Sequence, residues 1–270
     1  MIINGKKVGA VILAAGKGTR LGCTDCPKVM MEIGGGPIVS YIIDTLLEIG
    51  FEKENIVLVV GFKKEKVENY FGDRITYAHQ VEQNGTAHAA LTGMKELPTD
   101  IEHVLVLGGD DSAFYTSKTL FDFIDKHIRA NVVLSLLTAE PDEPGNLGRV
   151  VRHTDGKVEV IEKEYTTDEQ KKIREISTGT FCYDRNWFEE MYKTMPIMRK
   201  LGEYTLPTTV AMAHNNNLPH QFVKMENSNE WFGVNTPEEL EEANARKSVS
   251  GQAVSLPLLG GVGGGLPQAE

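Results

Sequence analysis

The sequence predicts an α/β fold with a mostly parallel, doubly wound sheet, followed by a smaller mixed β region. Through the first half of the chain, short apolar runs alternate with segments of helical periodicity. This order is typical of parallel strands joined by crossover helices. Glycine-rich turns follow two of the apolar runs, at residues 16–18 and 108–109. Because ligands bind at the carboxyl ends of the strands in such sheets, we expect both turns to lie at a binding site.

The first half contains five predicted strands, each a short apolar run that ends at a turn or a polar segment. They span residues 8–13, 56–60, 75–79, 103–107 and 132–138. The segments between them carry apolar side chains at helical spacing or are rich in alanine, and Pro37 is suited to the first position of a helix. Helices are therefore expected at residues 37–49, 62–71, 86–97 and 117–130.

The second half changes character after a loop rich in proline, glycine and acidic residues at 141–148. A hairpin is predicted next, because segments 149–152 and 157–161 flank an Asp155-Gly156 turn. The last helix opens with Thr236-Pro237-Glu238-Glu239, a capping box with proline at its first position. Between these elements we expect helices at 167–173 and 185–195 and strands at 176–183 and 221–225.

Residues 1–247 are expected to form one domain with two halves, 1–138 and 139–247. The remaining segment, 248–270, is rich in serine, glycine and leucine and has neither helical nor strand periodicity. We expect it to be a flexible, glycine-rich tail.

Composition argues against several classes of function. The formal net charge is −10 and no basic stripe is visible, so broad binding of nucleic acid through its phosphates is not expected. A few local cations can still bind a small phosphorylated ligand. No apolar run approaches the roughly 20 residues of a membrane span, and residues 1–7 do not resemble a signal peptide. Three cysteines, an odd and low number, favour a cytoplasmic location.

The glycine-rich loop after the first strand has the composition of a phosphate-binding turn. It reads Leu13-Ala14-Ala15-Gly16-Lys17-Gly18-Thr19-Arg20, and Pro27-Lys28 follows seven residues later. Its glycines let backbone N–H groups approach a phosphate, while Arg20 and Lys28 lie within reach of the same anion. The pattern is neither a Walker loop nor the dinucleotide fingerprint, whose third glycine would come one position late, at Gly22. The loop therefore predicts a cradle for a triphosphate.

The same loop contains a CxxC pattern at residues 23–26. A zinc site would need two further ligands, and Cys182 is the only other cysteine in the sequence. We therefore interpret Cys23 and Cys26 as loop residues, with a metal or redox role as the alternative.

Two oxygen-bearing side chains are candidates for binding Mg²⁺. Asp110 follows a buried strand beside Gly108 and Gly109, and Mg²⁺ takes one or two protein oxygens together with phosphate oxygens. Asn235 directly precedes the capping box, and its amide oxygen is the second candidate ligand. The alternatives are a turn or capping role for Asp110 and a turn-shaping role for Asn235. Asp111 is interpreted as a cap or spectator whose carboxylate can add to the site.

The segment from Gln80 to His88 suits the recognition of a nucleobase. Gln80 leaves a strand, and Gly85 and Thr86 open an alanine-rich helix. Backbone N–H groups at a helix N-terminus, with amide and hydroxyl side chains, can bind the edge of a base. The alternative is a threonine N-cap on a helix of good helix formers, with His88 in a packing role.

Two residues of the second half are candidates for contact with a ligand. Gly148 can place a backbone N–H against a ligand, or it can simply join a loop to a strand. Glu162 follows a strand and can accept hydrogen bonds from sugar hydroxyls, or it can be a solvated residue of the charged run at 162–164.

Taken together, these segments resemble the nucleotide-sugar pyrophosphorylase (sugar-1-phosphate nucleotidyltransferase) family. The resemblance covers roughly residues 8–245 and is greatest to the uridylyltransferase domain of bacterial N-acetylglucosamine-1-phosphate uridylyltransferase. It implies that family's Rossmann-like nucleotidyltransferase fold. Besides the loop with Pro27-Lys28, the shared motifs are Gln80-x-x-Gln83-x-Gly85-Thr86-Ala87-His88-Ala89, Gly109-Asp110, Gly148-Arg149, Ile161-Glu162, Thr178-Gly179, Glu203-Tyr204 and Gly233-Val234-Asn235.

The resemblance implies a role for each motif. Arg20, Lys28 and Asp110 are the implied catalytic residues, and Asp110 with Asn235 is implied to hold the catalytic Mg²⁺. Residues 1–138 become a nucleotide-binding half and residues 139–247 a sugar-binding half. The implied nucleotide-binding residues are Leu13, Ala14, Ala15, Gly16, Gly18, Thr19, Gln80, Gly85, Thr86 and Gly109. The implied sugar-binding residues are Gly148, Glu162, Ser177 and Thr178.

The implied reaction joins a nucleoside triphosphate, UTP being favoured, to a sugar-1-phosphate and releases pyrophosphate. N-acetylglucosamine-1-phosphate is the favoured acceptor, so the expected partners are small molecules. The alternatives are glucose-1-phosphate or another hexose-1-phosphate, a non-sugar phosphate acceptor such as phosphocholine with CTP, and a non-catalytic nucleotide-sugar sensor.

Three departures from the family bear on this implication. Ser177 stands where the family has asparagine, and its shorter hydroxyl cannot make paired amide hydrogen bonds. Thr208 replaces a family aspartate, and Pro207 beside it changes the local backbone. The acetyltransferase domain of the bifunctional members is not expected, because the segment after residue 247 has neither its length nor its hexapeptide period.

Overall fold

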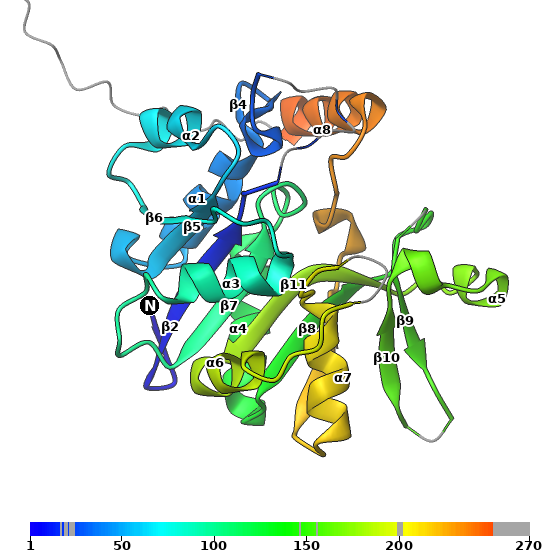
Figure 1. Ribbon diagram of the computed structural model, residues 1–270. Coiled ribbons are helices and arrows are strands. Elements are labelled where there is room, and N and C mark those ends of the chain that lie inside the picture. The colour runs from blue at the N-terminus through cyan, green and yellow to red at the C-terminus, as the bar shows by residue number, and fades with distance from the viewer. Residues whose placement is uncertain are drawn as a thin grey trace, which may run out of the picture.

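The computed structural model describes residues 1–16, 18, 21, 25–145, 147–154, 156–198 and 202–250. At its centre is one mixed β-sheet (Figure 1). The strands of this sheet are β2 (Lys6–Leu13), β5 (Ile56–Val60), β6 (Thr76–His79), β7 (His103–Gly108), β8 (Leu134–Ala139), β9 (Arg149–Arg152), β10 (Val158–Ile161), β11 (Ile176–Asp184) and β12 (His220–Lys224), with β1 (Ile2–Ile3) paired to β2.

The centre of the sheet is parallel, as predicted. β2 is parallel to β5 on one side and to β7 on the other, and β5 is parallel to β6. β11 is inserted antiparallel between β7 and β8, and β12 is parallel to β8 at the far edge. The β9–β10 hairpin is antiparallel, as expected, and joins the start of β11 through the pair Ile176–Arg149.

Helices cover both faces of the sheet. One face carries α1 (Ile38–Glu48), α2 (Lys64–Phe71) and α4 (Ser117–Ala130). The other face carries α3 (Thr86–Met94), α6 (Arg185–Tyr192) and α7 (Pro207–Asn215). No helix of the described part of the chain combines the length and apolar composition that a membrane span requires.

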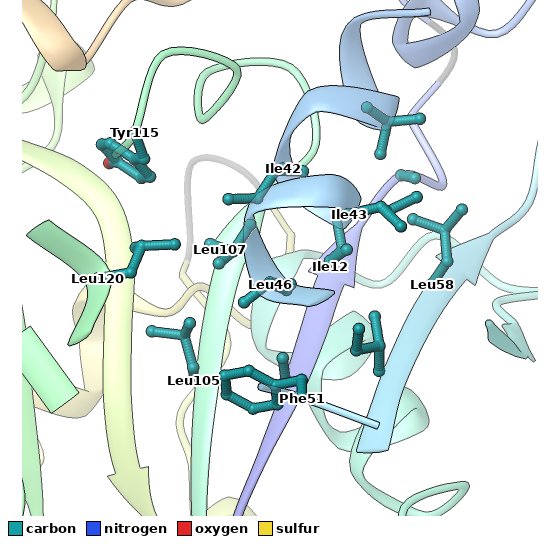
Figure 2. Packing of buried hydrophobic residues seen from close by; sticks show 14 of the residues in the cluster. Ile12, Ile42, Ile43, Leu46, Phe51, Leu58, Leu105, Leu107, Tyr115 and Leu120 are labelled. Carbon is teal, nitrogen blue, oxygen red and sulfur yellow. The ribbon is translucent and has the colours of Figure 1, made fainter. Parts of the chain in front are cut away.

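The two cores explain why the central strands are continuous apolar runs. Successive side chains of a strand point to opposite faces, so Val11 packs into the core with α3 and Ile12 into the core with α1. Figure 2 shows the α1 side, where Ile42 and Leu46 pack over the sheet with Phe51 nearby.

Smaller elements surround the sheet. The β9–β10 hairpin and α5 (Asp168–Lys171) stand out from one side of the sheet (Figure 1). A short hairpin of β3 (Glu32–Ile33) and β4 (Gly36–Pro37) contacts α8 (Pro237–Ser250). Short 3-10 helices are η2 (Lys28–Met30), η3 (Lys53–Asn55), η4 (Lys163–Tyr165) and η5 (Ser228–Glu230).

The observed elements match the predicted ones, with ends that differ by a few residues. α3 ends at Met94 and α6 at Tyr192, each three residues before the expected end. Pro37 precedes the first residue of α1 instead of occupying it. α8 continues to Ser250, three residues beyond the expected end of the domain at residue 247, and residues 251–270 lie outside the described part. The elements β1, β3, β4 and α7 were not predicted.

The path of the chain creates a crevice beside β2. In chain order, β5 and β6 are added on one side of β2. The chain then runs through α3, and β7 pairs with β2 on its opposite side. Such a reversal leaves a gap at the carboxyl ends of the two strands, where ligands bind in open α/β sheets. Leu13 ends β2 and Gly108 ends β7, so both glycine-rich turns predicted from the sequence lie at this crevice.

Candidate active site

Two adjoining cavities lie at the carboxyl ends of β2 and β7. The loop cavity has a volume of about 240 Å³ and is lined by Leu13, Gly16, Gly18, Leu21, Lys28, Val29, Asp110 and Asn235. The side cavity, of about 420 Å³, extends towards the β9–β10 hairpin and η4. Its walls include Thr86, Asp111, Gly148, Glu162, Ser177, Thr178, Gly179, Leu206, Pro207 and Trp231. Leu13 and Asp110 line both cavities, so the two meet at the end of the sheet.

Lys28 is held by two oxygen atoms in the loop cavity. Its side chain is 12% exposed, and its ammonium forms an ion pair with the Asp110 carboxylate. The same Nζ donates to Asn235 Oδ1 at 2.9 Å. The glycine-rich loop crosses the stem of this lysine, since a Cβ built on Gly18 would lie 2.6 Å from Lys28 Cβ. Gly18 has a φ of +62°, so glycine is needed there for both its conformation and its lack of a side chain.

Asp110 and Asn235 form a pair of oxygen ligands that suits Mg²⁺. Their side-chain oxygens converge on a single cation, the Lys28 ammonium. Mg²⁺ needs only one or two protein oxygens when phosphates and waters complete its shell. Within the described residues, no group of three or more histidine, cysteine, aspartate or glutamate side chains could hold a metal. The donor set therefore fits a nucleotide-bound Mg²⁺ better than an all-protein metal site.

The capping box predicted at residue 236 positions Asn235. The Glu239 carboxylate accepts hydrogen bonds from the backbone N–H of Asn235 at 2.6 Å and of Thr236 at 3.0 Å. The Thr236 hydroxyl accepts in return from the N–H of Glu239 at 3.2 Å. The N–H of Val234 donates to the Asp110 carbonyl at 3.2 Å, which joins this turn to the end of β7. The start of α8 is thus fixed against the residue expected to bind the metal.

Several implied nucleotide-binding residues contribute through the main chain. The N–H of Ala14 donates to Val59 O at 2.9 Å, and the N–H of Gly109 donates to Leu13 O at 3.0 Å. The Ala15 carbonyl accepts from Gln83 Nε2 at 2.9 Å, so the glycine-rich loop is tied to the segment that precedes α3. Gln83 was not among the predicted site residues, although it belongs to the shared motif.

The segment from Gln80 to Thr86 is braced by hydrogen bonds. Gln80 is buried, and its amide nitrogen lies 3.2 Å from the Gly85 carbonyl and 3.1 Å from His88 Nδ1. Gly85 has a φ of +102°, and a Cβ there would lie 2.4 Å from the Tyr204 carbonyl. The Thr86 hydroxyl accepts from the N–H of Leu206 at 3.0 Å. Thr86 lines the side cavity, whereas Gln80 lines a separate hollow beside Gly61.

The implied sugar-binding residues all line the side cavity. Gly148 lies against the end of β10, since a Cβ there would approach the Ile161 carbonyl to 2.9 Å. The Ser177 hydroxyl accepts from the N–H of Gly179 at 3.3 Å. The Thr178 hydroxyl donates to Leu137 O at 2.7 Å, so its side chain serves the sheet and its carbonyl accepts from the Trp231 indole N–H at 3.1 Å.

Asp111, interpreted from the sequence as a cap or spectator whose carboxylate can add to the site, lines the side cavity. Its Oδ1 is buried without a hydrogen-bond partner among the described residues. Burial, and then the charge of Asp110, hold the pKa of the Asp111 carboxyl well above its usual range. Two adjacent aspartates thus have different surroundings, one paired to Lys28 and one enclosed.

Some predicted residues lie outside the described part of the chain. These are Thr19 and Arg20 of the glycine-rich loop, Cys23 of the CxxC pattern and Asp155 of the hairpin turn. Their roles stay predictions. Cys182 is fully buried in β11, where burial raises the pKa of its thiol far above the usual range.

Known proteins resemble this chain along most of its length. A family model described as nucleotidyl transferase matches residues 9–248. The bifunctional protein GlmU of Geobacillus sp. (strain WCH70) is 35% identical over 235 residues, which are 87% of this chain and 50% of that protein. The bifunctional protein GlmU of Heliobacterium modesticaldum is 35% identical over 237 residues, 87% of this chain and 51% of that protein. The chain therefore spans about half the length of the curated relatives it matches.

A solved structure supports the fold. A crystal structure of a putative glucose-1-phosphate thymidylyltransferase from Bacillus anthracis, in complex with a sucrose, superimposes with a TM-score of 0.72. The match covers 89% of this chain and 95% of that chain at 18% sequence identity. At this identity the likeness concerns the Rossmann-like architecture alone.

Proposed function

The chain belongs to the nucleotidyl transferase family, and on that premise we propose that it transfers a nucleotidyl group from a nucleoside triphosphate to a sugar-1-phosphate. The products are a nucleotide sugar and pyrophosphate. UTP and N-acetylglucosamine-1-phosphate are the first proposed substrates. The motif from Gln80 to Thr86 and the 35% identity to bifunctional GlmU proteins support this choice.

The observation that carries the proposal is the position of Asp110 between the two cavities. The loop cavity offers a glycine-rich turn and the Lys28 ammonium, which suit a triphosphate. The side cavity offers the hydroxyl of Ser177 and the carboxylate of Glu162, which suit a polyhydroxylated acceptor. Because Leu13 and Asp110 line both, a donor and an acceptor bound in them would meet at the end of β2.

In the proposed reaction, an oxygen of the acceptor phosphate attacks the α-phosphorus of the triphosphate in line, and the bond to the pyrophosphate oxygen breaks. The nucleophile is already an anion, so the protein need not remove a proton from it. Catalysis then consists of positioning and of neutralising charge as two anions approach.

Each part of the loop cavity has a role in this scheme. The Lys28 ammonium neutralises the triphosphate, and Arg20 is the proposed second cation. The backbone N–H groups of the loop orient the phosphates. Asp110 and Asn235 would hold Mg²⁺, which when bound supplies further positive charge at the phosphates. The residue pair would bind it through the oxygens that contact Lys28 in this structure.

Ser177 supports glucose-1-phosphate or another hexose-1-phosphate as a second candidate acceptor. Its hydroxyl accepts from the N–H of Gly179 at 3.3 Å and cannot make the paired bonds of an amide. An acceptor without an N-acetyl group therefore loses less at this position than it would opposite asparagine.

A pyrophosphate-release screen of nucleoside triphosphates against a panel of sugar-1-phosphates, with Mg²⁺ present, tests the proposal. We expect release with UTP and an N-acetylhexosamine- or hexose-1-phosphate. Asp110→Asn should lower that rate by on the order of 10²-fold or more, because it removes the charged oxygen ligand proposed to hold Mg²⁺ at the reacting phosphates. Asp122→Asn, on an exposed ion pair of α4, is the matched control. Tight binding of nucleotide without pyrophosphate from any pair would contradict catalysis and favour a sensor.

A further inference from the structure

The Asp111 carboxyl is exceptional among the polar groups of the described interior. Its Oδ1 and the Nε of Arg149 are the buried side-chain polar atoms there that have no hydrogen-bond partner. The Arg149 guanidinium is nevertheless satisfied through its other nitrogens, which donate to three main-chain carbonyls. Buried polar atoms in native proteins are nearly always hydrogen-bonded, so a carboxyl that lines a cavity and has a buried oxygen without a partner requires an explanation.

The backbone around Asp111 leaves room for this carboxyl. A Cβ on Gly108 would lie 2.5 Å from Oδ1, and a Cβ on Gly179 would lie 3.7 Å from Oδ2. Gly179 has a φ of +74° and lies where β11 shifts register against β8. The position of residue 111 is also fixed from the loop after η5, since the N–H of Phe232 donates to the Asp111 carbonyl at 3.4 Å. The carboxyl is therefore held at the wall of the side cavity between β7 and β11.

The capping role expected for Asp111 is filled by another residue. α4 begins after Thr116, whose hydroxyl accepts from the N–H of Thr119 at 3.2 Å. The turn after β7 is closed by Ser112, whose hydroxyl donates to the Gly108 carbonyl. An isosteric apolar or amide side chain at 111 would leave these bonds intact, so the local fold does not account for the unpartnered oxygen.

We propose that Asp111 is a specificity-determining residue whose carboxyl accepts a hydrogen bond from a hydroxyl or amino group of the acceptor substrate. The inference rests on the proposed function, because the acceptor is the molecule that the side cavity would receive. Ser177 and Glu162 line the same cavity, so its polar wall matches an acceptor that offers several hydrogen-bond donors near its phosphate. Hexose-1-phosphates and 2-amino-2-deoxyhexose-1-phosphates have this chemistry.

Two variants separate acceptor binding from folding and from metal binding. Asp111→Leu removes the accepting oxygens and keeps the branched shape, and Asp111→Asn keeps an accepting oxygen but cannot ionise. Asp122→Asn is the control on the surface. The measurements are KM for the acceptor and for the triphosphate, the Mg²⁺ concentration for half-maximal rate, and the temperature of unfolding. Equilibrium binding of each sugar phosphate to the same proteins provides a readout that does not depend on turnover.

We expect Asp111→Leu to raise the KM and the dissociation constant of the acceptor by on the order of 10- to 100-fold. The KM of the triphosphate and the Mg²⁺ requirement should not change. The unfolding temperature should stay the same or rise, because a buried carboxyl oxygen without a hydrogen-bond partner destabilises the free protein. If Asp111→Asn weakens binding of the 2-amino-2-deoxyhexose-1-phosphate alone, the partner of the carboxyl is an ammonium group. If Asp111→Asn binds this acceptor and the hexose-1-phosphate almost normally, the partner is a hydroxyl group.

Unchanged acceptor binding in Asp111→Leu would overturn the inference. A lower unfolding temperature with normal acceptor binding would assign Asp111 a structural role, and a raised Mg²⁺ requirement with normal acceptor binding would make it a metal ligand; both also overturn it. These outcomes differ from failure of the proposed function, which would appear as absence of pyrophosphate from the wild-type protein with every substrate pair.

Discussion

Replacing Lys28 with methionine removes the cation of the loop cavity and keeps the stem that packs against Gly18. Two unit charges 4 Å apart interact by about 4 kcal/mol at an effective dielectric constant near 20, the scale expected for an ammonium beside a phosphate. Removing one fixed electrostatic stabiliser from other active sites costs about 2.7–4 kcal/mol in activation free energy. We therefore expect Lys28→Met to lower turnover by on the order of 10²- to 10³-fold.

The same structure predicts a small effect on stability. The side chains of Lys28 and Asp110 are 12% and 32% exposed, so water can solvate the carboxylate when its partner is lost. The free energy of unfolding should change by about 1 kcal/mol or less. Pyrophosphate release and urea unfolding are measured on wild type, Lys28→Met and Lys126→Met, an exposed lysine of α4. Turnover equal to that of wild type, or a loss that follows the unfolded fraction, would refute this reasoning.

Three further predictions follow from buried contacts. Burial lowers the pKa of His127 from 6.5 to about 3. As the pH falls, the unfolded state therefore binds a proton at this side chain before the folded state does. Stability should then decrease by about 1.4 kcal/mol per pH unit below about pH 6.5, and urea titrations of His127→Gln should lack this part of the slope; identical slopes would contradict it. Gly85→Ala places a methyl group 2.4 Å from the Tyr204 carbonyl at a φ of +102°. It should lower stability by about 1–3 kcal/mol and raise the KM of the triphosphate; normal values of both would be evidence against the tight turn. Glu239→Ala removes the acceptor of the Asn235 and Thr236 N–H groups. It should cost about 0.5–2 kcal/mol of stability and raise the Mg²⁺ concentration for half-maximal rate, and an unchanged Mg²⁺ requirement would show that the capping box does not position Asn235.

The order of strands and helices could be predicted because it depends on local patterns. Apolar runs such as β5 and the 3.6-residue period of α4 are visible without knowledge of contacts. α7 was missed because it contains β-branched and polar residues with weak helix propensity after Pro207, and it forms because Val210 and Ala213 are buried against the sheet. The antiparallel direction of β11 was also not predictable, since it depends on where the preceding hairpin returns the chain.

The candidate site also has a part that could be predicted from the sequence and a part that could not. Many of the described residues that were expected to line the site do line the two adjoining cavities. Others, such as Gly109, contribute through backbone hydrogen bonds instead. Gln80 borders a separate hollow. The sequence favoured a cap or spectator role for Asp111, because an aspartate after a strand most often serves as a cap. Its burial depends on the loop around Trp231, a segment distant in sequence.

The sequence by itself determined the alternation of strands and helices, the glycine-rich loop and the capping box, because each is a pattern of neighbouring residues. Only the tertiary structure decided that the ammonium of Lys28 meets oxygens that are 82 and 207 residues further along the chain. It also decided which of two adjacent aspartates pairs with that cation and which stays enclosed with an unpartnered oxygen. The physical reason is that charge pairing and burial depend on distances in space, and these are set when the sheet brings the ends of β2 and β7 beside the start of α8.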